Sequence, residues 1–265
     1  MLTRNNKAII ELSNHNYVPV VKDSAIYYGG SQMWFSTKNK HSKDYILHNY
    51  GCGTIATADL FLYLSMQNVV FRTPESEIAL GMSDSINYIN YDIYVRMFND
   101  QYTKTRKVIA VLGPKIASAF NSYSKAYGLG LFASWKWKLS YYDMYEIISE
   151  MLSADIPVIL SIGPNTPLLW GKKGIPFYQQ YDIKVSEDSE PITNAFQRYR
   201  YKAVTQPVNG HYVTVTGIIK DDIASAIMLR ISSWGKQYYI NYEEYRNYIE
   251  NSGDTFTSSL VYIKQ

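Results

Sequence analysis

The sequence predicts an α+β fold in which helices dominate the first part of the chain and an antiparallel sheet the last part. Apolar residues recur at helical spacing in the stretch 52–64 and again in 140–153. Two later stretches, 211–219 and 225–234, alternate as strands do. Because the helix-rich and strand-rich parts follow one another along 265 residues, we expect residues 1–265 to form a single α+β domain.

The opening segment, to about residue 43, is expected to form short strands as an N-terminal extension. The stretches "YVPVV" and "AIYYGGSQMWF" are rich in residues that favour strands. Gly29 and Gly30 in the second stretch suit a hairpin turn.

The clearest local pattern is a helix that Ser140 can cap and that Asp155 and Pro157 stop, followed by the buried strand "PVILSI". Another helix is expected near Pro74, which suits a first turn. "GPKIASAFNSYSKAYG" predicts a further helix that ends at Gly128, and "INYEEYRNYI" a short one near the end of the chain.

Composition excludes several classes of protein. Hydrophobic residues make up 46% and charged residues 18%, as in ordinary globular proteins, and the net charge of +3 is too small to indicate nucleic acid or an anionic membrane as partner. One cysteine and four histidines without metal-ligand spacing give no reason to expect a disulfide framework, a metal or another cofactor. The chain shows no apolar run typical of a signal peptide or membrane span, so a cytoplasmic protein of unknown oligomeric state is expected.

The single cysteine, Cys52, lies between Gly51 and Gly53 where the helical pattern begins. The thiolate is the reactive form of cysteine, and the positive end of a helix dipole favours it. A neighbouring imidazolium would favour it further. The two glycines would permit a tight turn into the helix and close approach of a substrate, while the Cys52 backbone N–H would face a developing oxyanion. The alternative is a small cysteine buried for packing alone.

A partner for Cys52 is offered by the strand pair near the end of the chain. If the turn is centred on residues 221–222, His211 and Ser232 face each other across the ladder with Cβ atoms about 5 Å apart. The same register puts Arg230 on that face, which requires a bulge.

Four stretches, "YGCGTIATADLFLYL", "IPVILSIG", "GHYVTVTGI" and "ISSWG", stand in an order that resembles the papain-like cysteine peptidases. The most similar branch is the bacterial one typified by peptidases that remove double-glycine leaders from bacteriocins. The resemblance spans roughly residues 49–249 by order of elements. It implies a papain-like fold, with a helical part carrying the cysteine followed by an antiparallel sheet carrying the histidine.

The resemblance assigns roles to the singled-out residues. Cys52 would be the nucleophile and His211 the general base and acid. Ser232 falls where the family has the Asn or Asp that orients the imidazole, and Trp234 would shield that contact from water.

The family's oxyanion-hole glutamine stands five or six residues before the cysteine, where this chain has Ile46 and Leu47. Asn49 carries the nearest side-chain amide and is the predicted substitute. His48 is the second choice.

The expected function is therefore that of a thiol hydrolase that cleaves a peptide or amide bond through a Cys-His thioester mechanism. Two alternatives remain open: an acyltransferase that uses the same site on a small acyl or amide substrate, and a catalytically weak or inactive module that binds peptide. The long polar segment 164–209 is expected to be an insertion that folds over one side of the cleft.

Overall fold

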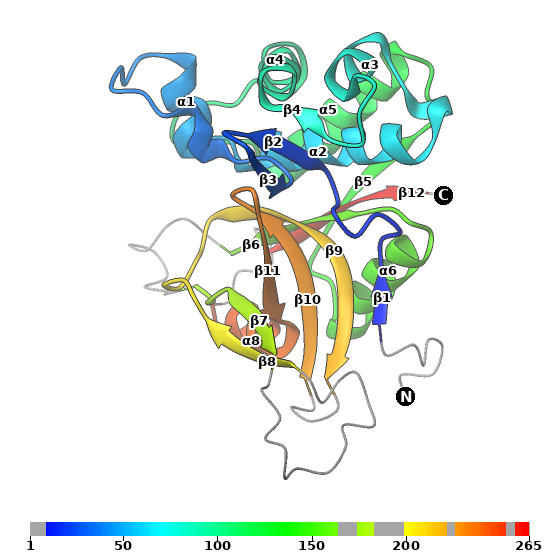
Figure 1. Cartoon of the computed structure of the whole chain (residues 1–265). Helices are drawn as coiled ribbons and strands as arrows, with labels where there is room; N and C mark the ends of the chain where they lie inside the picture. The colour runs from blue at the N-terminus through cyan, green and yellow to red at the C-terminus, as the bar shows by residue number, and fades with distance from the viewer. Residues whose placement is uncertain (1–8, 164–173, 183–198, 222–225, 253–257, 265) are drawn as a thin grey trace.

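The computed structural model describes residues 9–163, 174–182, 199–221, 226–252 and 258–264. In these residues seven α-helices accompany a large antiparallel sheet, so the fold is of the mixed α+β class that the sequence predicts. Figure 1 shows the helices of the first half of the chain gathered at one end of the molecule and the sheet at the other. The two parts are therefore segregated in space as well as along the chain.

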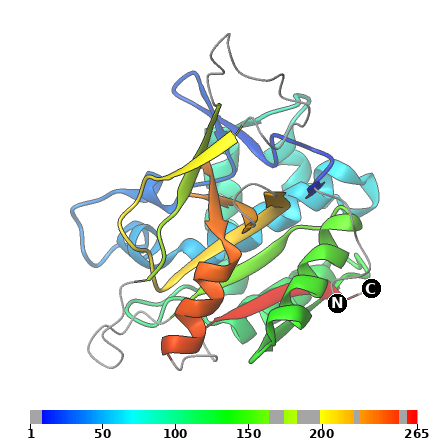
Figure 2. The same ribbon diagram turned by 90° about the horizontal axis from the view of Figure 1, so that it is seen from below.

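The helices of the first half are α1 (Lys43–Tyr50), α2 (Cys52–Gln67), α3 (Pro74–Leu80), α4 (Tyr88–Phe98) and α5 (Gly113–Ala126), with the short helical turns η1 (Gln32–Phe35), η2 (Val69–Phe71) and η3 (Asn99–Thr103). The second half contributes α6 (Tyr141–Ser153) and α8 (Tyr242–Ser252). In Figure 2, seen from below, α6 and α8 lie in front of the strands and the helices of the first half lie behind them.

Local capping explains where several helices begin. The Ser140 hydroxyl accepts a hydrogen bond of 3.1 Å from the N–H of Asp143 and caps α6, as predicted. Pro74 occupies the first turn of α3, where Thr73 and Ser76 cap each other's backbone.

The large sheet contains β1 (Ile9–Glu11), β5 (Phe132–Trp137), β6 (Val158–Ile162), β7 (Tyr178–Asp182), β8 (Tyr199–Ala203), β9 (His211–Asp221), β10 (Ala226–Ser233), β11 (Lys236–Asn241) and β12 (Ser259–Lys264). The strand order is β5-β12-β6-β9-β10-β11-β7-β8, and β1 pairs with β9. One edge of β9 is paired with β10, and the other is shared by β6 near its start and β1 near its end. A small second sheet is formed by β2 (Pro19–Lys22), β3 (Ala25–Tyr28) and β4 (Ile86–Asn87).

The register of β9 with β10 differs from the predicted one. The connection between the strands is longer than a two-residue turn at 221–222. A register shift follows Arg230, and this is the bulge that the position of Arg230 requires. As a result Ser232 lies opposite Thr214 and not opposite His211.

The N-terminal hairpin also turns elsewhere than predicted. Strands β2 and β3 are joined by Asp23 and Ser24, whose φ angles of 50° and 62° are those of a type I′ turn. Gly29 and Gly30, where the sequence predicts the turn, instead lead from β3 into η1.

Helix α2 lies at the centre of the fold. Fourteen of its sixteen residues are buried, because β9 contacts it on one side and α3, α4 and α5 contact it on others. A helix that is buried on all sides needs no polar stripe facing solvent, and the sequence of α2 has none.

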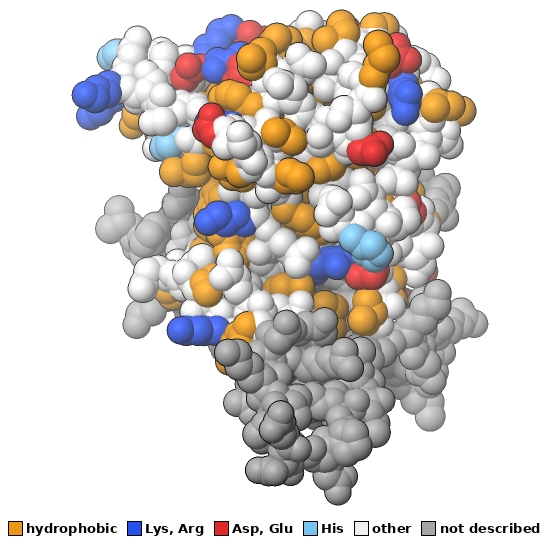
Figure 3. All heavy atoms as spheres, viewed as in Figure 1, with side chains coloured by type: hydrophobic (Ala, Val, Ile, Leu, Met, Phe, Trp, Pro, Cys, Tyr) orange, Lys and Arg blue, Asp and Glu red, His pale blue; other side chains and the backbone are white. Residues whose placement is uncertain are grey.

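The segment 164–209 is described only in part, since residues 164–173 and 183–198 lie outside the described residues. Its described part includes β7 and β8, which pair with each other and extend the sheet beside β11. No helix in the described parts of the chain has the length and apolar character needed to cross a bilayer. On the face drawn in Figure 3, basic and acidic side chains are interspersed.

Candidate active site

Cys52 is the first residue of α2, as the sequence predicts. Helices α1 and α2 meet at Gly51, which ends the first and caps the second. A Cβ at Gly51 would lie 2.3 Å from the carbonyl oxygen of Leu47, so this junction requires glycine. As the first residue of its helix, Cys52 has a backbone N–H without a partner inside that helix.

Gly53 serves a different purpose from the predicted one. A Cβ at this position would lie 3.0 Å from Ile116 of α5 and 3.3 Å from Tyr212 of β9. The absence of a side chain at Gly53 therefore lets α2 pack closely against α5 and β9. These neighbours already fill the space, so no substrate could approach Gly53.

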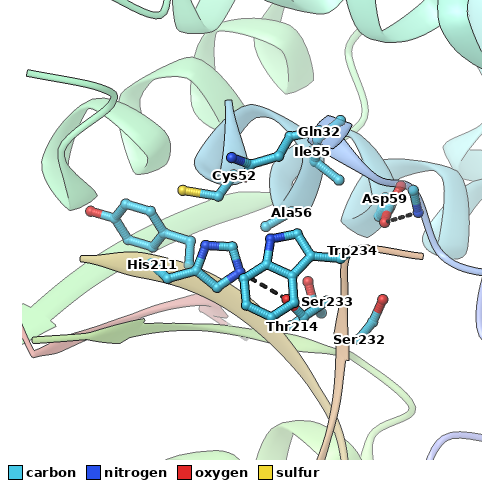
Figure 4. Close-up of a pocket in the computed structure, with 12 residues that line it drawn as sticks. Gln32, Cys52, Ile55, Ala56, Asp59, His211, Thr214, Ser232, Ser233 and Trp234 are labelled. Atoms are coloured by element: carbon cyan, nitrogen blue, oxygen red, sulfur yellow. Dashed lines mark hydrogen bonds between the residues drawn. The ribbon is translucent and has the colours of Figure 1, made fainter. Parts of the chain in front are cut away.

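Cys52 and His211 line one small pocket, whose cavity volume is about 20 Å³. The other lining residues come from η1 and the segment before it, α2, β9, and the hairpin of β10 and β11: Gly30, Gln32, Ile55, Ala56, Asp59, Tyr212, Thr214, Ser232, Ser233 and Trp234. Figure 4 shows the Cys52 thiol and the His211 ring on the same side of this pocket. The fold thus brings the two predicted chemical groups together from opposite parts of the chain.

His211 is oriented by Ser233 and not by Ser232. Its Nε2 atom lies 2.8 Å from the Ser233 hydroxyl (Figure 4), and this bond leaves Nδ1 as the ring nitrogen available to the thiol. The Ser232 hydroxyl donates a hydrogen bond of 2.7 Å to the backbone oxygen of Tyr28. The reason is the register: with Ser232 opposite Thr214, the next residue shares the face of His211.

Trp234 stacks on the imidazole of His211, with ring centroids 4.6 Å apart and planes inclined by 21°. Phe177, from the described part of the 164–209 segment, lies against Trp234 at 5.4 Å. Trp234 and Gly235 form the turn between β10 and β11, with φ angles of 50° and 74°. Asn-Gly is the usual choice for such a turn, so a bulky residue is held here against its backbone preference.

The predicted oxyanion donor Asn49 does not reach the pocket. It is exposed on α1, and its amide donates to the backbone oxygen of Tyr45 at 2.8 Å. Gln32 lines the pocket instead, and Figure 4 shows its amide end directed towards Cys52. The Gln32 amide donates a hydrogen bond of 2.8 Å to the backbone oxygen of His48, so His48 contributes its carbonyl group and not its ring.

Burial keeps the thiol and the imidazole neutral in this structure. Cys52 and His211 are 8% and 7% exposed. Burial raises the pKa of the Cys52 thiol, although backbone N–H groups of Tyr212, Gly53 and Cys52 itself oppose the rise. Burial also lowers the pKa of His211 to about 3. The pair therefore stands as a thiol beside a neutral imidazole.

The sequence did not indicate the carboxyl group of Asp59, which also lines the pocket. It lies seven residues after Cys52 and hence on the same face of α2. Its carboxylate accepts hydrogen bonds from the Tyr91 hydroxyl at 2.6 Å and from the N–H of Gly30 at 2.9 Å. Burial raises the pKa of Asp59 to about 7, and these two hydrogen bonds oppose the rise.

Within the described residues, no group of three or more His, Cys, Asp or Glu side chains could hold a metal ion. In comparisons with known proteins, the chain matches no family model, no curated protein and no solved structure. Any functional conclusion therefore depends on the chemistry of the pocket itself.

Proposed function

We propose that this protein is a papain-like thiol hydrolase that cleaves a peptide or amide bond through a thioester on Cys52. The observation that carries the proposal is a single pocket that holds a thiol at a helix N-terminus, an imidazole fixed through one nitrogen, and a side-chain amide. Thiol, base and oxyanion donor are the three groups that acyl transfer requires. The resemblance of the "GCG", "GHYVTVTGI" and "ISSWG" stretches supports the same assignment.

The proposed reaction begins when the Cys52 sulfur attacks the carbonyl carbon and the thiol proton passes to Nδ1 of His211. The backbone N–H of Cys52 and the amide of Gln32 then donate to the negatively charged oxygen. The C–N bond breaks, and the amine leaves with the proton from His211. Water attacks the thioester with His211 again as base, which releases the carboxylic acid and restores the thiol.

The small pocket suits a single carbonyl group, with the rest of the substrate outside. Its cavity volume of about 20 Å³ is room for about one water molecule. A peptide would therefore present its scissile carbonyl at the mouth of the pocket, between Gln32 and His211.

The second candidate function is a peptide-binding module without catalysis. The specific observation in its favour is the burial of Cys52 and His211. Burial raises the pKa of the thiol and lowers the pKa of the imidazole, so both groups are kept neutral. In a catalyst, the proton must move from sulfur to nitrogen as substrate arrives. In a binding module, no such transfer is needed.

The rate of alkylation by iodoacetamide distinguishes the two. Cys52 is the only cysteine, so every modified thiol reports on the site. A hydrolase should be labelled at pH 7 at least about tenfold faster than its His211→Ala variant, because the imidazole takes up the thiol proton. Equal, slow labelling of both proteins would contradict the hydrolase and favour the module. The acylated enzyme is then incubated with an amine. A hydrolase releases mainly the carboxylic acid, whereas an acyltransferase forms mainly the amide.

A further inference from the structure

Residues 28–32, which we call the strap, run from the end of β3 to the start of η1 and carry Gln32 into the pocket. Two side chains fix the start of this strap. The N–H of Gly30 donates to the Asp59 carboxylate at 2.9 Å, and the backbone oxygen of Tyr28 accepts from the Ser232 hydroxyl at 2.7 Å. One anchor belongs to the central helix and the other to β10.

The strap lies so close to these anchors that its two glycines could not carry side chains without a shift of their neighbours. A Cβ at Gly29 would lie 2.4 Å from the Ser232 hydroxyl and 2.8 Å from the Asp59 carboxylate. A Cβ at Gly30 would lie 1.6 Å from the Tyr91 hydroxyl, which itself donates to Asp59. Both glycines are therefore required for the strap to lie where Asp59 and Ser232 can hold it.

Asp59 and Ser232 line the same pocket as Gln32 but hold no position in the proposed reaction steps. A buried carboxylate is costly unless its hydrogen bonds are well made, and here one of them ends on the backbone two residues before Gln32. An amide displaced by even about 1 Å would lose most of its effect on a developing oxyanion.

We propose that Asp59 and Ser232 are positioning residues for the oxyanion donor: together they fix the strap so that the Gln32 amide stands beside Cys52. The proposal rests on the proposed function, since it gives Gln32 the role of oxyanion donor. Ser232 thereby has a role distinct from that of its neighbour Ser233, which bonds His211. Adjacent residues of one strand thus hold the base and, through the strap, the oxyanion site.

The test uses the full chain and three probes of Cys52: p-nitrophenyl acetate, its thiono analogue and iodoacetamide. Attack on the ester places charge on oxygen, and attack on the thiono ester places it on sulfur, a weak hydrogen-bond acceptor. Alkylation by iodoacetamide displaces iodide and makes no oxyanion. The ratio of ester to thiono-ester acylation therefore measures the oxyanion site, and alkylation measures the thiol and its base.

We expect Asp59→Ala to lower ester acylation and the ester to thiono-ester ratio about tenfold, with alkylation changed less than about twofold. Asp59→Asn retains the shape and an acceptor for Gly30, and should restore the ratio to within about threefold of wild type. Ser232→Ala should lower the ratio of ester to thiono-ester acylation about threefold. If Asp59→Ala does not fold, this second variant tests the proposal. The control is Ser65→Ala, which removes a hydroxyl that bonds the Phe71 carbonyl at the far end of α2.

Two results overturn the proposal alone: an unchanged ratio in both Asp59→Ala and Ser232→Ala, or a loss of alkylation equal to the loss of acylation. A wild type that p-nitrophenyl acetate does not acylate, with alkylation independent of His211, would overturn the proposed function and this inference together. The wild-type measurements therefore separate the two kinds of failure.

Discussion

Replacing Asp59 by asparagine should make the protein gain stability relative to wild type as the pH rises from acid to neutral values, because Asp59 is a buried acid and asparagine does not titrate. The folded protein holds a proton on Asp59 up to about pH 7, whereas the unfolded chain releases it near 3.8. Between these values the folded state binds more protons, so the stability that Asp59 contributes falls as the pH rises from about 4 to about 7. Asparagine does not titrate, and its contribution stays constant.

The magnitude follows from the two pKa values. At about 1.4 kcal/mol for each pH unit, the full difference approaches about 4 kcal/mol, and about 2–3 kcal/mol of it falls between pH 5 and pH 8. The neighbouring hydroxyls of Tyr17 and Tyr91 stay neutral in this range, because burial and then the charge of Asp59 raise the pKa of each well above 10. The low pKa of His211 affects both proteins alike and cancels in the comparison.

Urea denaturation at pH 5 and pH 8 measures the effect. We expect the free energy of unfolding of Asp59→Asn, relative to wild type, to rise by about 2–3 kcal/mol between the two pH values. Asp84→Asn, at an exposed position, controls for the change in net charge. If the two stability curves run parallel over this range, Asp59 does not carry a raised pKa in the folded protein, and the reasoning is refuted.

Other substitutions test separate parts of the site. Ser233→Ala removes the hydrogen-bond partner of His211 Nε2. It should slow both alkylation and ester acylation of the Cys52 thiol about tenfold, which is about 1.4 kcal/mol of barrier. Rates equal to those of wild type would show that the serine does not orient the ring. Phe177→Ala removes a fully buried ring and should lower the unfolding free energy by about 3–5 kcal/mol in urea; a loss below about 1 kcal/mol would show that the ring is not part of the core. Gly51→Ala should cost about 1–3 kcal/mol in the same assay, because its Cβ meets a backbone oxygen, and an unchanged midpoint would contradict that contact.

Local patterns made the fold class predictable. The helices that begin near Pro74 and at residue 141, and the strands β6, β9 and β10, all follow from periodicity, caps and breakers within a few residues. The start of α2 at Cys52 was predictable for the same reason, since the helical pattern begins there after glycine.

The wrong predictions about the site concern Ser232 and Asn49. Which side chains meet in the pocket depends on contacts between residues far apart along the chain, and no local sequence pattern reveals such contacts. Whether Ser232 or Ser233 meets His211 depends on the length of a connection and on a bulge, and a shift of one residue moves a side chain to the other face. Gln32 stands 20 residues before Cys52, and only the path of the strap brings the two together. Asn49 was closer along the sequence, but the helix α1 carries it away from the pocket.

The left-handed backbone of Trp234 has a consequence for the order of folding. In the unfolded chain a tryptophan resists this conformation by about 1 kcal/mol or more, so the turn between β10 and β11 is a poor nucleus by itself. The turn becomes favourable only after β9 is in place, because the indole of Trp234 can then stack on the His211 ring. We therefore expect the hairpin to close late: Trp234→Ala should accelerate unfolding in stopped-flow experiments and leave the folding rate nearly unchanged, and a slower folding rate would place the turn in the nucleus. The last contacts to form in folding would then be those that cover the imidazole of His211.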